Sequence, residues 1–299
     1  MPLRWSRITP QIALAPAVGV TLVAFLGAIG WTILMSFTRS RRLPEYEIDW
    51  DNPFRQFNRL FNDAGWQISL QNLIVLALGS ALAIVVGFIL AAMIERERRG
   101  EDVFRTVFLY PLAGSLIVTG VAWRWILNPQ FGIESLLRGL GWESASFNWL
   151  SDPATAMYAI IIASIWQSAG FYMALMLAGL KGINTEIWSA ARIDGVRLWR
   201  VYIEIIIPMM KFTFLTCAIL LSLGVIKAFD IVLAMTNGGP GQSTWVPAYY
   251  TINAMSAKGN LGLASAAAVL MLLITLAVFL PLVALTAWQQ RQARNGHAT

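Results

Sequence analysis

The sequence predicts an all-α integral membrane protein that crosses the bilayer with six transmembrane helices. Hydrophobic residues make up 57% of the 299 residues, charged residues make up 13%, and the mean hydropathy is +0.62. Soluble domains carry about 25% charged residues, so this composition favours the membrane class. Each of six apolar runs is long enough for the roughly 20 residues that a transmembrane helix needs. The runs cover 11–38, 71–94, 103–127, 157–180, 209–236 and 263–288.

The first run follows a short basic segment, 1–10, which is also how a signal peptide begins. A signal peptide has an apolar region of about 7–15 residues and a small-residue cleavage site. This run is longer and lacks a clear cleavage site, so we expect a retained first span. The third run contains Pro111, Gly114 and Gly120, which a membrane helix tolerates because neighbouring helices satisfy freed backbone groups.

The basic residues predict the orientation of the chain. Six spans place both termini on the same side of the membrane, and cytoplasmic loops carry an excess of Lys and Arg. With a cytoplasmic N-terminus, 13 of the 22 Lys and Arg residues lie inside, 7 lie outside and 2 lie in spans or at their ends. We therefore expect a cytoplasmic N-terminal segment 1–10, a transmembrane domain 11–288 and a cytoplasmic tail 289–299. The polar segment 183–208 is then cytoplasmic as well.

Several classes of chemistry are excluded by composition. Cys217 is the single cysteine and His297 the single histidine, so no intrachain disulfide, thiol–imidazole pair or multi-histidine metal site can form. The chain has no G-x4-GK-[ST] phosphate-binding loop. The net charge of +6 and the pI of 9.8 agree with the positive-inside bias, and we expect no nucleic-acid partner.

The segment 183–208 mixes charged and apolar residues between two spans. Asn184 or Thr185 is suited to cap a helix, and Glu186 in its first turn suits the helix dipole. Asp194-Gly195 predicts a break. We therefore expect a helix, a turn and a second helix at the membrane surface, which predicts a docking surface for another protein. An amphipathic helix lying in the interface is the alternative.

This segment resembles the cytoplasmic Glu-Ala-Ala loop of ABC importer permeases. In that pattern a glycine follows six residues after the glutamate, and Ile-x-Leu-Pro begins sixteen residues after it. The wider run from Ala190 to Pro208 resembles the sugar-uptake branch of the family. The leading glutamate is replaced by Ser189 here, which removes any ion pair that it makes with the ATPase. The spacing of the pattern is kept, with Ile207 in place of its leucine, by Ser189, Ala190, Ala191, Asp194, Gly195, Ile205, Ile207 and Pro208.

A second stretch, 229–244, independently resembles the same sugar permeases. Its pattern is FD-x5-T-x-GGP-x2-ST, and its physical content is a tight Gly-Gly-Pro turn after the fifth span. The matching residues are Phe229, Asp230, Thr236, Gly238, Gly239, Pro240, Ser243 and Thr244.

The resemblance implies the type I ABC importer permease fold and the function of a membrane subunit in a binding-protein-dependent sugar importer of the maltose type. It implies a transport subunit rather than an enzyme, in a bacterial inner membrane. This chain would bind no cofactor, and ATP and Mg²⁺ would lie in two cytoplasmic ATPase subunits. The other partners implied are a second homologous permease chain, an extracytoplasmic sugar-binding protein, the sugar and membrane lipid. The implied ATPase-coupling residues are Glu186, Ser189, Ala190, Ala191, Asp194 and Gly195.

Polar residues in the fourth and fifth runs are candidates for sugar binding, because polar groups within spans usually face a bundle interior or an aqueous path. Ser164, Gln167, Ser168 and Phe171 share one helical face, beside Tyr172. The resemblance also points to Phe171, where maltose-type members place an aromatic residue. Lys227 and Asp230, three residues apart, could pair or line the cavity. Packing between helices through small polar residues is the alternative for each.

The sequence does not identify the sugar, and a permease for glycerol phosphate or another polar solute is the alternative. An ion-driven secondary transporter is a rival class, which predicts inverted repeats and broken midplane helices and needs no docking loop. An intramembrane enzyme is a third class, and the chain lacks the constellation of histidines or paired acids that it needs.

Overall fold

The computed structural model describes residues 5–96, 100–144, 146 and 148–296. Residues 1–4 of the expected N-terminal segment and 297–299 of the expected tail lie outside these ranges, as do 97–99 in the loop before the third run. No strand forms in the described part, where one isolated bridge joins Thr38 and Ile48. The chain divides into two compact units, Met1–Asp63 with Tyr250–Leu272, and Ala64–Tyr249 with Leu273–Thr299.

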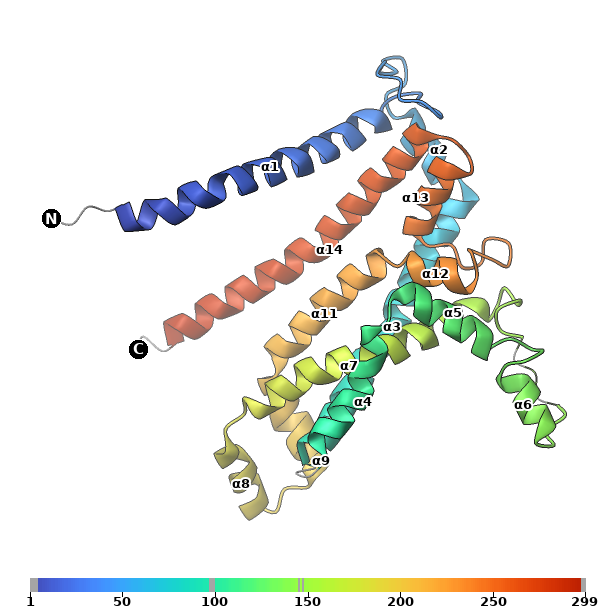
Figure 1. The fold of residues 1–299 in the computed structure, drawn as a ribbon. Coiled ribbons are helices and arrows are strands. Elements are labelled where there is room, and N and C mark those ends of the chain that lie inside the picture. The colour runs from blue at the N-terminus through green and yellow to red at the C-terminus, as the bar shows by residue number, and fades with distance from the viewer. Residues whose placement is uncertain (1–4, 97–99, 145, 147, 297–299) are drawn as a thin grey trace. The chain divides into compact units, whose positions relative to one another are not determined.

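Four helices in the described residues are long and apolar enough to cross a membrane, and two bent pairs raise the number to six. The long helices are α1 (Trp5–Ser36), α3 (Ala64–Arg96), α7 (Ala156–Lys181) and α14 (Leu261–Gly296) (Figure 1). Their apolar content and length are what an all-helical membrane protein requires, since only closed backbone hydrogen bonding is stable in lipid.

The third run forms two helices rather than one continuous helix. α4 (Glu101–Ala113) and α5 (Leu116–Ile126) meet at 96°. Gly114 has extended backbone angles, and the Ser115 hydroxyl accepts a hydrogen bond from the Val118 N–H at 3.2 Å. Ser115 is therefore the N-cap of a new helix, which begins after α4 has passed through Pro111 and ended at Ala113.

The fifth run is also broken. α9 (Leu198–Arg200), the π-helical turn η1 (Val201–Ile206) and α10 (Ile207–Met209) precede α11 (Lys211–Ile226), which leaves at 71°. Val201 and Ile206 are buried against the larger unit's core, so the second half of the expected polar loop is a packed helical segment. After α11, a break at 227–229 separates it from α12 (Asp230–Met235).

The core of the larger unit lies where α3 and α7 pack side by side, with α4 and α11 against them (Figure 1). Small residues allow the close approach. A Cβ on Gly87 would lie 2.7 Å from the Met173 nitrogen, and one on Gly170 would lie 1.8 Å from the Phe108 carbonyl oxygen. Backbones this close are typical of helix packing in membranes. Helix association there depends on van der Waals packing, and small residues let the backbones approach closely. Lys181 and Glu101 form an ion pair at the cytoplasm-facing ends predicted for α7 and α4.

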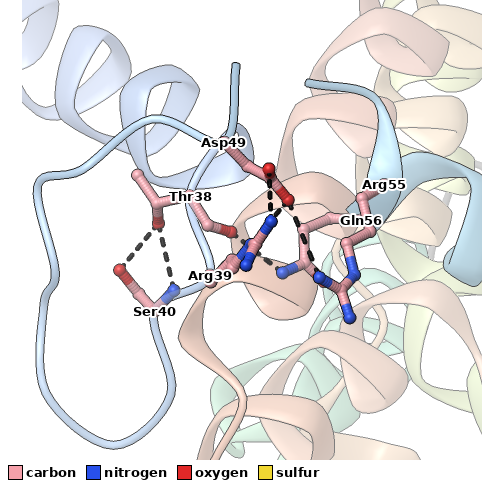
Figure 2. Close-up of polar contacts among 6 residues, drawn as sticks. All are labelled: Thr38, Arg39, Ser40, Asp49, Arg55 and Gln56. Atoms are coloured by element: carbon pink, nitrogen blue, oxygen red, sulfur yellow. Dashed lines mark hydrogen bonds and ion pairs between the residues drawn. The ribbon is translucent and has the colours of Figure 1, made fainter. Parts of the chain in front are cut away.

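In the smaller unit, a network of hydrogen bonds and ion pairs around Asp49 follows α1. Arg39 donates two hydrogen bonds to this carboxylate, at 2.7 and 2.6 Å, and an Arg55 nitrogen lies 3.7 Å from it. The Gln56 amide donates to the Thr38 carbonyl at 2.9 Å, and the Thr38 and Ser40 hydroxyls are bonded. Figure 2 shows both arginines directed at the buried carboxylate. The loop is therefore fixed beside α2 (Arg55–Phe61).

Candidate functional site

The predicted coupling segment folds as α8 (Thr185–Ile193), a helix with a defined start and end. The Asn184 side chain accepts a hydrogen bond from the Glu186 N–H at 3.0 Å, so it is the N-cap. At the other end, Gly195 has a φ of +62°. The Gly195 N–H donates to the Arg192 carbonyl and the Val196 N–H to the Ala191 carbonyl. This pair of bonds is a Schellman motif, which needs the left-handed conformation that glycine adopts without strain.

One face of α8 is buried and the other is open. Ala191 is buried, and the remaining predicted coupling residues are exposed: Glu186, Ser189, Ala190, Asp194 and Gly195. Ile193, which the sequence reasoning did not single out, is 85% exposed beside them. An isoleucine next to the Asp-Gly break was the available signal. Apolar and charged groups together on one exposed face are typical of a docking surface.

Aromatic contacts connect α8 to the packed helices α3 and α11. The rings of Trp188 and Tyr202 meet edge to face at 5.5 Å, and Tyr202 meets Phe88 of α3 at 6.1 Å. The Tyr202 hydroxyl donates to the Ala92 carbonyl at 3.5 Å. Phe88 also contacts Phe214 of α11. The exposed helix is thus connected through packed rings to α3 and α11.

A cavity of about 230 Å³ lies among α3, α5, α7, α11 and α12 in the larger unit. The structure brings Ser164, Gln167, Ser168 and Tyr172 to its wall. Phe171 does not line it, and its ring instead packs edge to face on Tyr172 at 5.5 Å. The cavity also contains Ser80 of α3, which the sequence reasoning missed. A lone serine in an apolar run was the signal for it.

Gln167 is a buried polar residue at this cavity, and a hydrogen bond holds its side chain. Its side chain is 6% exposed, and its amide nitrogen donates to the Gly114 carbonyl at 3.1 Å, at the break between α4 and α5. Its buried amide oxygen has no hydrogen-bond partner in the part of the chain that the structure describes. A buried polar atom without a hydrogen-bond partner costs folding free energy. A solute hydroxyl that donates a hydrogen bond to this oxygen would remove that cost.

The two serines offer acceptors rather than donors. The Ser164 hydroxyl donates to the Ile160 carbonyl at 2.8 Å, and the Ser168 hydroxyl donates to the Ser164 carbonyl at 2.6 Å. Their lone pairs remain available, because each hydroxyl oxygen has two. A solute with hydroxyl donors fits this combination of acceptors, and the remaining wall is largely apolar.

Lys227 and Asp230 flank the lining residues Ala228 and Ile231 but are not lining residues themselves. Within the described residues neither side chain joins an ion pair or lines the cavity. The expected pairing at three residues' separation requires an unbroken helix. α11 ends at Ile226 and α12 begins at Asp230, so the two positions belong to different elements.

The Gly-Gly-Pro stretch forms a braced loop after α12. The Thr236 and Thr244 hydroxyls are hydrogen-bonded at 2.8 Å, and the Thr244 hydroxyl donates to the Gly239 carbonyl at 2.9 Å. Asn237 and Gly238 have φ values of +50° and +79°. The Tyr249 hydroxyl donates to the Asn237 carbonyl at 2.7 Å. The side chains of the motif residues Thr236 and Thr244 thus hold the turn in place.

Comparison with known proteins places this geometry in a family. Residues 83–295 match the family described as binding-protein-dependent transport system inner membrane component. A probable ABC transporter permease of Pyrococcus horikoshii is 35% identical over 93% of this chain and 96% of its own length. A xylose/arabinose import permease of Haloferax volcanii is 30% identical over 93% of this chain and 89% of its own length.

The fold is that of a solved transporter. A crystal structure of a bacterial ABC transporter involved in the import of the acidic polysaccharide alginate matches with a TM-score of 0.79 at 19% identity. The match covers 95% of this chain and 98% of that chain. The helical spans, this fold and the family match agree. The chain therefore belongs to the family of inner membrane components of binding-protein-dependent transport systems.

Proposed function

We propose that this transport component carries a sugar through the cavity beside α7, in an importer driven by ATP. The observation that carries the proposal is the buried amide oxygen of Gln167, which has no hydrogen-bond partner among the described residues, on a residue that lines the same cavity as Ser164 and Ser168. Sugars present many hydroxyl donors, and an unmet acceptor in a low-dielectric site rewards such a donor. The named relative that imports xylose and arabinose supports this solute class.

The proposed energy input enters at α8. In this proposal, two cytoplasmic ATPase subunits bind ATP and Mg²⁺, and one of them receives the exposed face of Ala190 and Ile193. A second homologous permease chain completes the path, and an extracytoplasmic binding protein delivers the sugar. The packed rings of Trp188 and Tyr202 give the docked helix a direct contact to α3, so its displacement would move the membrane core.

The test is solute uptake by proteoliposomes that contain the complete complex. Gln167→Ala removes the buried acceptor, and we expect uptake to fall about tenfold, since a lost buried hydrogen bond costs about 1–3 kcal/mol. Thr216→Val is the matched control, because that exposed hydroxyl donates only to the Phe212 carbonyl of its own helix. Equal uptake by both variants and the parent would overturn the site. Uptake without ATP would favour an ion-driven transporter.

A further inference from the structure

A second hollow, of about 400 Å³, lies at the far end of α5 and is lined mainly by polar groups. It is bordered by the loop 148–151 and by the Gly-Gly-Pro loop after α12. Its polar side chains come from Arg124, Asn128, Asn148, Ser151 and Thr236. Among the described residues that line it none is acidic, and Arg124 is charged and positive. Its volume is in the range of small-molecule sites.

The cleft and the cavity lie at opposite ends of the same two helices. Ile231 of α12 lines the cavity, and Met235 of the same helix lines the cleft. Four residues of helix span about 6 Å along the axis. On α5, Leu116 lines the cavity and Arg124 lines the cleft. The helices touch closely, since a Cβ on Gly120 would lie 2.5 Å from the Ala234 Cβ.

The wall built by the Gly-Gly-Pro loop is fixed before any ligand arrives. Thr244 is fully buried and ties Thr236 to the Gly239 carbonyl. The Asn72 amide of α3 donates to the carbonyls of Ser243 and Trp245, each at 2.8 Å. A site whose wall is preorganised loses less free energy on ordering when a ligand binds. The loop thus holds one face of the cleft in place.

Arg124 is exposed to the cleft and joins no ion pair in the part of the chain that the structure describes. Its neighbours hold the helix end, because Trp123 packs on Trp166 and Trp125 packs on Phe131. Asp152 lies beside the cleft residue Ser151 in sequence, and one of its carboxylate oxygens accepts the Ala154 N–H. A guanidinium stays charged and presents paired donors that match an oxyanion.

We propose that this cleft binds the oxyanion of an acidic sugar, a carboxylate or a phosphate, before the solute reaches the cavity. Arg124 donates to the oxyanion, and the side chains of Asn128, Asn148 and Thr236 contact the sugar hydroxyls. The inference rests on the proposed function for the direction of travel. It assigns to the Gly-Gly-Pro motif the task of shaping one wall of a binding site.

The experiment measures binding to the purified complete complex in nanodiscs by calorimetry. The probes are galacturonate, glucose 6-phosphate and neutral galactose. We expect both acids to bind more tightly than galactose, and Arg124→Gln to weaken acid binding about tenfold while leaving galactose unchanged, as for loss of a charge-assisted bond. Arg124→Lys keeps the charge without the fork and should retain part of the affinity. Arg105→Gln, an exposed arginine on α4 that lines neither hollow, is the control.

The arms separate the possible results. Tighter binding of galacturonate alone identifies a carboxylate site, and of glucose 6-phosphate alone a phosphate site. Equal acid affinities in the parent and Arg124→Gln overturn the inference. Uptake of neutral sugar by the same complex reports on the proposed function independently. A complex that imports sugar but binds acids identically with and without Arg124 would reject the cleft and keep the transport function.

Discussion

At the scale of single residues, Gly195 fixes the end of α8, the helix that we propose docks to the ATPase. A Cβ at this position meets no atom within 4 Å, so only the backbone angle opposes a substitution. Gly195→Val should destabilise the turn by about 1–2 kcal/mol, because a left-handed residue other than glycine is strained. We expect several-fold less ATPase to co-purify with the complex.

The control for Gly195 is Gly139→Val. Gly139 ends α6 (Ile133–Gly139), has open space around it and does not have a positive φ. Co-purification equal to the parent for both variants would contradict the role of the Schellman turn in docking. A loss in both would point to a general sensitivity of exposed glycines.

Asp49 makes the smaller unit sensitive to acid. The Arg39 hydrogen bonds lower the pKa of Asp49, and burial opposes them in part (Figure 2). A carboxyl with a lowered folded pKa contributes stability above its unfolded value, near 3.9, and that contribution is lost as the pH falls through the folded pKa. Thermal midpoints measured between about pH 7 and pH 3 should therefore fall more in the parent than in Asp49→Asn. A parallel decline in the two proteins would contradict this.

At the scale of elements, the crossing of α4 and α7 depends on Gly170. A Cβ at Gly170 would lie 1.8 Å from the Phe108 carbonyl oxygen, which is backbone and cannot rotate away. Gly170→Ala should force the helices apart and lower the stability of the complex by about 1–3 kcal/mol or more. The measurement is the thermal midpoint in detergent, with Gly27→Ala of α1, which has open space, as the control.

The sequence predicted some elements well because their signals are local. The expected run 157–180 lies within α7, since length and hydropathy suffice to mark an unbroken helix. The break between α4 and α5 was not predicted, although Pro111 and Gly114 were visible. That break depends on the Ser115 cap and on the Gln167 amide, which arrives from a helix 53 residues further along the chain.

The candidate site divides in the same way. Helical spacing brought Ser164, Gln167 and Ser168 onto one face, and the structure places them on one cavity wall. Phe171 has the right spacing but packs against Tyr172, because neighbouring helices decide which part of a face is open. The rest of the wall comes from α3, α4, α5, α11 and α12, and of these α5 and α12 begin at helix breaks that periodicity does not reveal.

At the scale of the whole molecule, the orientation in the membrane is open to a direct measurement. Cys217 is the single cysteine and is buried. A Cys217→Ser background therefore contains no thiol. Leu43→Cys, at an exposed position between α1 and α2, should react with an impermeant maleimide in intact cells. Ser189→Cys on α8 should react only after permeabilisation. The reverse pattern would place the docking helix outside and remove its access to an ATPase.

Gln167 has a consequence that reaches beyond its own contacts. Its nitrogen donates to the Gly114 carbonyl at the helix break, and the residue lines the cavity while its amide oxygen is buried. In the proposed site, the same amide group takes part in solute binding and in the helix break between α4 and α5. Thermodynamic linkage then requires that each of these two equilibria affects the other by the same free energy. A solute that binds one arrangement of the break more tightly must shift the break toward that arrangement, by a free energy no larger than its differential affinity. The side chain can then report the occupancy of the cavity to the corner of α4 and α5.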